Sequence, residues 1–400
     1  MIKVLYLHPF GVNGGATKSL SEVFAAMQKC EIEGAVIAPA GVASTSLTSV
    51  GLRVLPVKGL AQWDDTRFGH YRGFRWLILL RELAYWPSSV VALRKAARQG
   101  PFDLIHCNEI TALLVGLLAK RMLSIPLLVH VRSLQRDACE GSKVTAWLQG
   151  LLRRHADAIV AIDESVRRTL PTDLPVHIIH NGMRVPLKPY HRSINNSELF
   201  RVGIIGVLHR SKGIYELLAA VKLLHTRGVP IKLIIAGVNG RSLKGISGWL
   251  LKKLDFAQDV HADLKNYVSS NGLSHIVEFV GFVRDVDSLY HRIDAVCFPS
   301  HLDAPGRPVF EAALNGLPSI VAMKNPTNDV IIQGVTGICI DKPDPKLIAN
   351  AIQDLSSNRK MAYEMGLKAQ EIALSKFDSQ ISAEKMIELY KKVKLGNRFQ

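Results

Sequence analysis

Residues 299–318 read PSHLDAPGRPVFEAALNGLP and predict a loop that leads from a strand into a helix. The five residues before them, DAVCF at 294–298, are a short apolar run typical of a buried strand. Glu311 opens an apolar segment with helical spacing, so we expect the helix to start near Ala312. A Gly-Leu-Pro exit then ends the helix before another apolar run at 319–322. This order of elements predicts a parallel α/β sheet.

The loop between strand and helix also predicts a place where a ligand could bind. In an open parallel sheet, ligands bind beyond the carboxyl ends of the strands, where helix N-termini present backbone N–H groups to phosphate. We therefore expect residues 299–318 to lie at a nucleotide-binding edge of the sheet.

The same alternation of strand and helix runs through the whole chain. In the first half we expect strands at 2–7, 34–38, 53–57, 104–107, 127–131, 158–161 and 177–179. In the second half we expect them at 200–206, 231–236, 276–280, 294–298, 319–322 and 337–340. Helical patterns separate the strands, among them 17–28, 214–226, 345–356, 359–375 and 379–394. Alternation of this kind is the signature of doubly wound α/β domains.

The domain division follows from length and from one break in the pattern. A chain of 400 residues with 48% hydrophobic content can bury more than one core. The segment 186–199 is rich in Pro, Ser and Asn and interrupts the periodicity, so we interpret it as a linker. The predicted units are an N-terminal domain at 1–185, a second domain at 200–375 and a final segment at 376–400.

The net charge of +16 favours anionic partners. Residues 1–199 carry 24 Lys and Arg against 15 Asp and Glu, and residues 200–400 carry 26 against 19, so both halves are basic. Aromatic residues make up only 7% of the chain, which argues against a nucleic-acid partner. Nucleotides or acidic lipid headgroups fit this charge better.

The N-terminus and the cysteines indicate the cellular compartment. No apolar run approaches the roughly 18 residues that a membrane span needs, and the first ten residues lack a secretory pattern, so we expect a cytoplasmic location. The cysteines are odd in number and lack a CxxC pair, which predicts neither a disulfide framework nor a zinc site. We expect Cys107 and Cys297, which fall in apolar strands, to be buried.

Polar residues at strand ends are candidates for a site in the first half. Gly14 and Gly15 stand at the first strand-to-helix turn, where a ligand could approach the backbone, although the GxGxxG spacing is absent and a plain tight turn explains them equally well. His130 ends one predicted strand, and Asn108 and Glu109 end another. For His130, a histidine whose hydrogen bonds are satisfied within the core is an equally good alternative. Asn181 and Gly182 predict a turn.

Cations at one turn of the second half are candidates for a diphosphate site. Arg210 and Lys212 stand between a strand and a long helix, where positive charge and backbone N–H groups suit a diphosphate. A solvated surface turn is the alternative.

Two stretches combine basic and apolar residues. The segment 241–254, RSLKGISGWLLKKL, could form a basic amphipathic helix on an anionic membrane surface, although an ordinary surface helix explains it more simply. For the aromatic and arginine-rich stretch 67–86 we expect packing into the core.

Several of these residues occur together in one family. The set Gly14-Gly15, His130, Asn181-Gly182, Gly206 with Lys212-Gly213, and DAPGRPVFE at 303–311 resembles the GT-B glycosyltransferases of family 4. The resemblance covers nearly the whole chain in the right order. Its strongest motif is the pair of carboxylates eight positions apart, Asp303 and Glu311, which is similar to the family's E-x7-E.

The resemblance implies a GT-B fold, with two doubly wound Rossmann-like domains facing across a cleft and the last helix crossing back onto the first domain. Glu311 would then bind the ribose hydroxyls of a nucleotide-sugar donor. Backbone N–H groups at Gly306, Arg307, Pro308 and Val309 would hold the diphosphate. Lys212, with Arg210 assisting, would neutralise the charge on the departing diphosphate.

In the rest of the implied site, His130 would contact the donor sugar, and Gly14 and Gly15 would let the sugar and diphosphate approach. The implied nucleobase pocket is formed by three consecutive residues: Gly281, Phe282 and Val283. The sequence departs from the family at three places. Asp303 is one methylene shorter than the usual Glu that contacts the sugar, Val207 stands where the family commonly has Arg, and Arg184 where it usually has an acid.

The activity that the resemblance implies is retaining, metal-independent transfer of a sugar from a nucleotide-sugar, most simply a UDP- or GDP-sugar, to a glycan or lipid-linked acceptor. Cell-surface polysaccharide biosynthesis is the expected setting, without a cofactor and with the inner face of the cytoplasmic membrane as a further partner. Two alternatives stay open. One is a GT-B sugar-nucleotide epimerase, and the other is a non-catalytic GT-B protein that binds an anionic ligand or a membrane surface.

Overall fold

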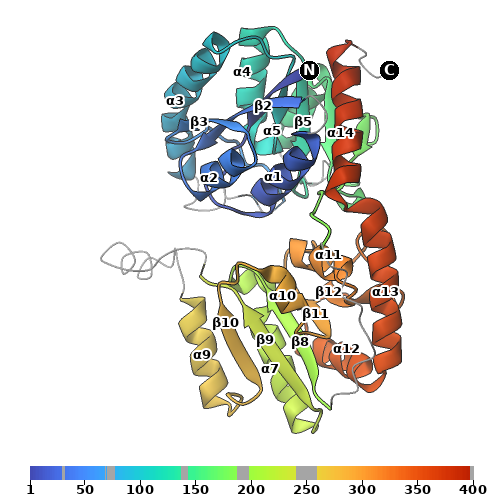
Figure 1. The fold of residues 1–400 in the computed structure, drawn as a ribbon. Helices are drawn as coiled ribbons and strands as arrows, with labels where there is room; N and C mark the ends of the chain where they lie inside the picture. The colour runs from blue at the N-terminus through green and yellow to red at the C-terminus, as the bar shows by residue number, and fades with distance from the viewer. Residues whose placement is uncertain are drawn as a thin grey trace. The chain divides into compact units, whose positions relative to one another are not determined.

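The computed structural model describes residues 1–28, 32–67, 69, 77–136, 143–186, 198–239 and 259–396. The chain divides into two compact units, one formed by Met1–Arg184 with Lys376–Gln400 and the other by Val185–Ser375. Each unit is an open parallel sheet with helices on both faces (Figure 1). The two doubly wound sheets predicted from the sequence are confirmed.

The first unit contains a sheet of seven parallel strands in the order β3-β2-β1-β4-β5-β6-β7. The order runs outward from β1 in both directions, so the carboxyl ends of β1 and β4 meet where the winding reverses. The strands are β1 (Ile2–Leu7), β2 (Ile32–Pro39), β3 (Arg53–Val57), β4 (Leu104–Cys107), β5 (Leu127–Val131), β6 (Ala158–Ala161) and β7 (Val176–Ile178).

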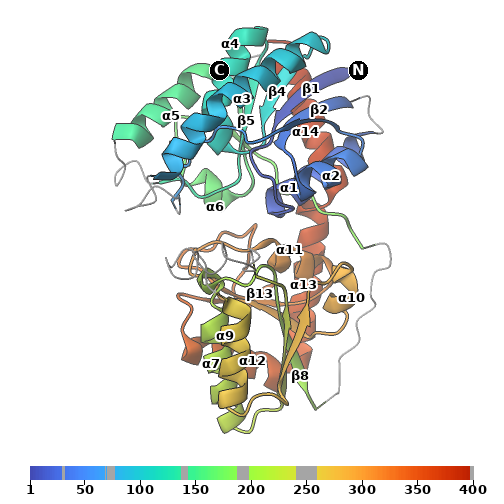
Figure 2. The same cartoon turned by 90° about the vertical axis from the view of Figure 1, so that its left-hand side faces the viewer.

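Helices cover both faces of this sheet (Figures 1 and 2). They are α1 (Gly15–Met27), α2 (Val42–Ser49), α3 (Ile78–Arg98), the 3-10 turn η3 (Ile110–Ala112), α4 (Leu113–Leu123), α5 (Lys143–His155), α6 (Glu164–Arg167) and the C-terminal α14 (Ser379–Lys394). The strand β1 shows why two layers are needed, because its side chains are buried on both faces.

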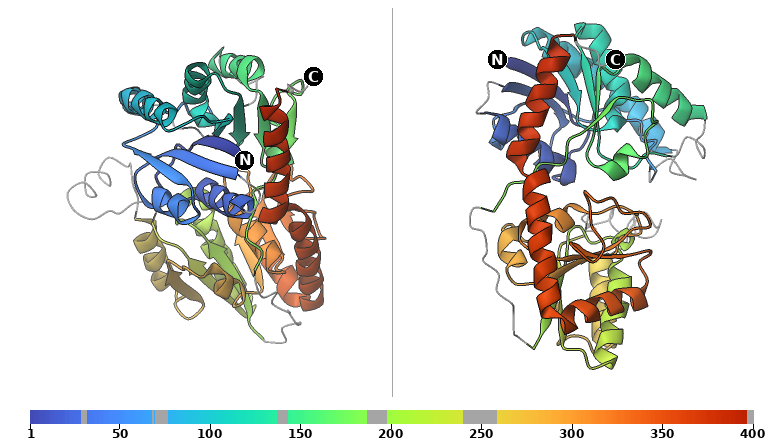
Figure 3. Two further views of the ribbon diagram at one scale, coloured as in Figure 1. Left: turned by 45° about the horizontal axis from the view of Figure 1, so that its top comes forward. Right: turned by 90° about the vertical axis from the view of Figure 1, so that its right-hand side faces the viewer.

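The C-terminal helix α14 is part of the core of the first unit (Figure 3). Its residues Met386 and Tyr390 are buried together with Tyr6 of β1 and Phe24 of α1. Gly182 explains how the chain approaches α14 so closely, because an added Cβ would lie 2.9 Å from the Cα of Ser379. The turn that we expected at residues 181–182 is not formed, and the glycine serves close packing instead.

The second unit contains a sheet of six parallel strands in the order β10-β9-β8-β11-β12-β13. The strands are β8 (Phe200–Ile205), β9 (Ile231–Ala236), β10 (Val277–Gly281), β11 (Ala295–Phe298), β12 (Ser319–Ala322) and β13 (Gly337–Ile340). The helical elements are η4 (Arg210–Lys212), α7 (Ile214–Thr226), α9 (Val260–Ser270), α10 (Val286–Tyr290), α11 (Arg307–Leu314), α12 (Pro345–Ser357) and α13 (Arg359–Lys376).

Alternate residues of the central strands are buried in two separate hydrophobic clusters, one on each face of the sheet. Leu233 and Ile235 of β9 pack with α7, α9 and α12, whereas Ile234 packs with α10 and α11. This period of two is what a strand buried on both faces requires. In both units the observed strands lie within two residues of the predicted ones.

Two kinds of N-terminus recur among the helices, apart from α3 and α4, which follow Leu77 and Ala112. Five helices begin after an aspartate whose carboxylate accepts a backbone N–H of the first turn: Asp163, Asp259, Asp285, Asp344 and Asp378. By contrast α1, α7 and α11 begin at Gly14, Gly213 and Gly306, and α2 at Gly41, without a side-chain cap. An aspartate cap supplies negative charge to the helix dipole, and a glycine leaves that place to another group.

Two segments for which the sequence made predictions lie outside the described residues. They are the basic segment 241–254 and residues 187–197 of the expected linker. Across the parts of the chain that the structure describes, no helix is both long and apolar enough to cross a membrane. Cys107 and Cys297 are fully buried as expected, and burial raises the pKa of both thiols.

The expectation that the stretch 67–86 packs into the core is wrong for its described helical part. Leu77, Leu80 and Leu83 are exposed, whereas Glu82 between them is buried. Helical spacing alone did not reveal that the inward face of α3 carries the carboxylate.

Candidate functional site

The turn between β8 and α7 is fixed by a glycine that admits no side chain. Gly213 has φ of 70°, and an added Cβ would lie 1.8 Å from the carbonyl oxygen of Pro299. Two hydrogen bonds hold the same contact, because the Ser211 carbonyl accepts the His301 N–H at 2.9 Å and the Ser300 hydroxyl at 3.2 Å. The turn that carries Lys212 is therefore locked against the loop after β11.

Lys212 is a half-buried cation without an acidic neighbour in the part of the chain described. Its Nζ lies 4.9 Å from the ring centroid of Phe298, the last residue of β11. Burial alone lowers the pKa of this ammonium. A positive charge that is desolvated and not paired with a carboxylate costs stability, so an anionic ligand would relieve that cost.

The N-terminus of α11 lies against the same aromatic ring. Gly306 is the residue before the helix, and an added Cβ would lie 2.2 Å from the Phe298 ring. Lys212 and the start of α11 therefore meet at Phe298, which brings together two of the predicted diphosphate groups. Arg210 is exposed, and its guanidinium carbon lies 5.1 Å from the ring centroid of Tyr215.

The helix α11 begins at Arg307, five residues before the start near Ala312 that we expected. Pro308 occupies the first turn, where its lack of an N–H is tolerated. The same lack means that Pro308 cannot donate to a diphosphate, and the Val309 N–H already bonds the Gly306 carbonyl at 3.0 Å. The prediction that all of residues 306–309 supply donors is therefore corrected for these two positions.

Glu311 is held by two side chains, as Arg307 Nε donates to Oε1 at 2.6 Å and the Tyr290 hydroxyl donates to Oε2 at 2.9 Å. Each carboxylate oxygen has a second acceptor position, so these contacts orient the carboxylate and leave it able to accept hydroxyls from a ligand. Tyr290 is fully buried in α10, and the sequence analysis missed its role because no local pattern links it to Glu311.

Asp303 has a structural contact that the motif did not predict. Its Oδ1 accepts the N–H of Lys324, which follows β12, at 2.9 Å, and its φ is 49°. Aspartate tolerates this left-handed backbone better than most residues. Asp303 thus ties the loop after β11 to the chain after β12.

The residues predicted for the nucleobase lie at the end of β10. Gly281 has φ of 68°, and its carbonyl accepts the Gly237 N–H at 2.8 Å, which joins the ends of β10 and β9. The Phe282 side chain is 71% exposed, whereas Val283 packs against the cluster on α10 and α11. Of these three residues, Phe282 is the one that presents an aromatic face to solvent.

Gly14 and Gly15 form an open N-terminus on α1 in the first unit. Both are exposed, and an added Cβ at either position would meet nothing within 4 Å. Packing within the unit therefore does not require these glycines, and the space above the N-terminus of α1 is open to a ligand.

His130 is buried at the end of β5, which is the core placement that we weighed against a ligand contact. Its Nδ1 lies 3.2 Å from an Arg132 guanidinium nitrogen and 3.3 Å from His106 Nε2. Because arginine can only donate, Nδ1 of neutral His130 accepts, and its ring proton lies on Nε2. His130 Nε2 is buried and has no hydrogen-bond partner in the described part of the chain.

The pKa of His130 lies well below its usual value because of burial first and the nearby Arg132 second. The pKa of His106 is lowered for the same two reasons. Its Nδ1 lies 2.6 Å from the hydroxyl of Tyr390 on α14. These imidazoles are therefore neutral near pH 7, and α14 takes part in orienting them.

Arg132 organises the polar strand ends of the first unit, a role that the sequence analysis missed. It donates to the Asn108 carbonyl at 2.9 Å and to the Asn108 side chain at 2.8 Å, and it also bonds the Asn181 side chain. The Asn108 amide nitrogen lies 2.9 Å from His8 Nδ1. Side chains at the carboxyl ends of β1, β4 and β5 and in the segment after β7 thus form one network, in which His8 and Asn108 are fully buried and Arg132 and Asn181 are half-buried.

Within the described ranges, no three His, Cys, Asp or Glu side chains gather closely enough to hold a metal ion.

Comparisons with known proteins cover most of the chain at the level of family. A glycosyl transferase 4-like domain model matches residues 14–182, and a glycosyl transferases group 1 model matches residues 191–372. The capsular polysaccharide biosynthesis glycosyltransferase CapM of Staphylococcus aureus is 23% identical over 314 residues, which are 73% of this chain and 77% of CapM. The D-inositol 3-phosphate glycosyltransferase of Corynebacterium diphtheriae is 25% identical over 352 residues, 80% and 78% of the two chains.

Solved structures share the fold. The structure of HepE from Anabaena in complex with UDP and glucose matches with a TM-score of 0.74 at 22% identity, over 98% of this chain and 100% of HepE. A complex of the same protein with UDP-glucose matches at 0.72 and 21% identity. These likenesses, together with the two parallel sheets, establish the GT-B fold.

Proposed function

Because the chain belongs to the group 1 glycosyltransferases and has the GT-B fold, we propose that it transfers a sugar from a nucleotide-sugar donor to a glycan or lipid-linked acceptor with retention of configuration. Cell-surface polysaccharide or glycolipid synthesis is the setting that we propose. Similarity to CapM supports a polysaccharide acceptor.

The observation that carries the proposal is the cation beside an open helix N-terminus in the second unit. Lys212 lies over the ring of Phe298, and Gly306 leaves the N-terminus of α11 bare against the same ring. A diphosphate would accept from the helix N-terminus and neutralise the desolvated ammonium. Both interactions strengthen as negative charge develops on the departing nucleoside diphosphate, which is the condition for lowering a barrier.

The remaining donor contacts follow from the orientation of Glu311 and Phe282. Glu311 is held by Arg307 and Tyr290, and in the proposal it accepts the two ribose hydroxyls. The exposed ring of Phe282 offers a face on which a nucleobase can stack. UDP is our first choice of nucleotide because HepE binds it, and GDP is the second.

On the first unit, the open N-terminus at Gly14 and Gly15 and the buried donor His130 Nε2–H are the proposed contacts to the sugar end of the donor. Asp303 is proposed to act on the sugar through its carboxylate while Oδ1 anchors the loop. The proposed reaction needs no metal ion, because Lys212 and the start of α11 take its place on the diphosphate.

The first experiment is a thermal-shift panel of UDP, GDP, ADP and CMP and their sugars, followed by a transfer assay with the selected donor and chelator present. A ligand selective for the folded state must raise the unfolding temperature. Donor turnover that needs no acceptor would favour an epimerase, and the absence of any nucleotide shift at millimolar concentration would favour a non-catalytic binding protein.

Two substitutions test the site itself. Lys212→Met and Glu311→Gln are each expected to lower turnover at least about a hundredfold, in line with loss of one preorganised charged group. Glu311→Gln keeps an acceptor oxygen for Tyr290, so it disturbs packing less than Glu311→Ala. Wild-type turnover in either variant would refute the site assignment. Chelator-sensitive turnover would refute metal independence.

A further inference from the structure

Helix α3, together with Leu77 directly before it, presents an apolar stripe to solvent. Leu77, Leu80, Leu83 and Val91 are 65%, 63%, 56% and 48% exposed. At 100° per residue these positions fall on one side of the helix. We call this surface the α3 stripe, and its members are Leu77, Leu80, Leu83, Ala84, Pro87 and Val91.

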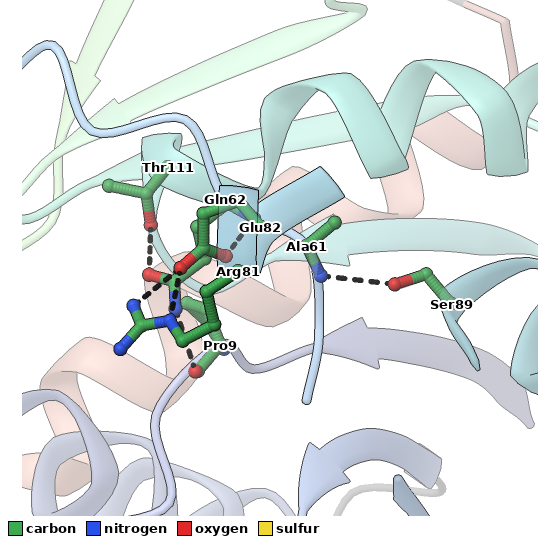
Figure 4. Close-up of polar contacts among 7 residues, drawn as sticks. All are labelled: Pro9, Ala61, Gln62, Arg81, Glu82, Ser89 and Thr111. Carbon is green, nitrogen blue, oxygen red and sulfur yellow. Dashed lines mark hydrogen bonds and ion pairs between the residues drawn. The ribbon is translucent and has the colours of Figure 1, made fainter. Parts of the chain in front are cut away.

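Polar bonds hold the opposite side of α3 against the first unit (Figure 4). The buried Glu82 accepts the Gln62 N–H at 3.0 Å through Oε2, and the buried Ser89 accepts the Ala61 N–H at 3.0 Å. Glu82 and Ser89 are seven residues apart, so they share one face of the helix. Anchoring this face turns the α3 stripe outward.

The anchored segment is itself fixed from two further sides. Gln62 Nε2 donates to the Pro9 carbonyl at 3.2 Å, and the Thr111 hydroxyl donates to Gln62 Oε1 at 3.3 Å (Figure 4). Rolling α3 to bury its leucines would break the bond to Glu82 and leave a buried carboxylate without its backbone donor. The outward position of the stripe is therefore built into the fold.

The exposed charges of α3 are all positive. The helix carries Arg81, Arg94, Lys95 and Arg98, and its single acidic residue, Glu82, is buried and bonded to Arg81 Nε at 2.9 Å. The last three cations are exposed and follow the α3 stripe along the helix. An apolar stripe with a cationic border complements an anionic lipid surface, whose headgroups attract the cations while its acyl boundary takes the leucines.

We propose that the first unit docks on an anionic lipid surface through the α3 stripe, with Arg94, Lys95 and Arg98 contacting the headgroups. A second copy of the chain fits this face less well, because two such faces would bring like charges together. The proposal rests on the geometry of α3 and is independent of the transfer reaction, so either one can fail alone.

The test is co-sedimentation of the full chain with vesicles of phosphatidylcholine alone or with added phosphatidylglycerol. The variant Leu80→Gln/Leu83→Gln is expected to bind the anionic vesicles at least about tenfold more weakly than wild type. The matched control Leu367→Gln/Leu374→Gln changes two exposed leucines of α13 in the second unit and is expected to bind like wild type. Unfolding temperatures of all variants should be equal, because the substituted side chains are exposed.

A second variant separates charge from apolar contact. Arg94→Gln/Lys95→Gln/Arg98→Gln is expected to weaken binding to anionic vesicles and to reduce its dependence on salt, with little effect on neutral vesicles.

Four results would overturn the proposal. Wild type could fail to bind anionic vesicles, or Leu80→Gln/Leu83→Gln could bind as well as the α13 control. Loss of binding only in Trp249→Glu/Leu250→Glu would transfer the contact to the segment 241–254. A dimer in sedimentation velocity that Leu80→Gln/Leu83→Gln dissociates would assign the stripe to a second copy instead.

Discussion

Replacing Gly213 with alanine should disable the site through the backbone alone. Gly213 and Gly228 have φ of 70° and 71°, so alanine at either position carries the left-handed backbone cost of about 1–2 kcal/mol. At Gly213 the new Cβ would also lie 1.8 Å from the Pro299 carbonyl, whereas at Gly228 it would meet nothing within 4 Å. Forcing a methyl group into a packed place costs about 1–3 kcal/mol more.

The two variants therefore form a matched pair in the second unit. Gly213→Ala should lose about 2–5 kcal/mol of unfolding free energy and Gly228→Ala about 1–2 kcal/mol, measured by urea unfolding followed by circular dichroism. Because Lys212 directly precedes Gly213, the clash also displaces its ammonium, and a displacement of about 1 Å can cost about a hundredfold in turnover. Equal losses of stability and equal turnover in the two variants would refute the packing of the turn against Pro299.

Two more outcomes follow from buried polar groups. Burial lowers the pKa of His8 to about 3 and those of His106 and His130 well below 6.5, so these groups take up protons only on unfolding. The free energy of unfolding should fall as pH drops below about 6.5, by up to about 1.4 kcal/mol per pH unit for each histidine, and urea midpoints that stay constant from about pH 7.5 to about pH 5 would contradict this. Tyr290→Phe removes one donor to Glu311, so it should cost about 1 kcal/mol of stability and raise KM for the donor several-fold at nearly constant kcat, whereas an unchanged KM would argue against a role of Tyr290 in orienting the carboxylate.

The strands were predictable because buried parallel strands are continuous apolar runs, and AVCF at Ala295–Phe298 is one of them. The predicted start of α11 lies too late because the apolar segment with helical spacing begins only at Glu311. Pro308 in the first turn was the better signal, since proline is favoured at that position and disfavoured further in.

Contacts between residues far apart in the sequence could not be predicted from local sequence patterns. The hydrogen bond between Tyr290 and Glu311 joins two helices, α10 and α11. Arg132 follows β5 and Asn181 follows β7, and the two side chains meet only because these strands end at the same edge of the sheet. The orientation of α3 is a further case, because it depends on the bond between Glu82 and the Gln62 backbone. Such contacts depend on tertiary packing, which local propensity does not encode.

The most direct test of the central claim is calorimetric titration of UDP and UMP, or of the matching pair for the base that the thermal-shift panel selects, into wild type and Lys212→Met. Wild type is expected to prefer the diphosphate, and Lys212→Met is expected to lose about ten- to a hundredfold of this preference. The unfolding temperature should be unchanged or higher, because a desolvated charge has been removed. A Lys212→Met variant that keeps the full preference for the diphosphate would contradict the proposed site.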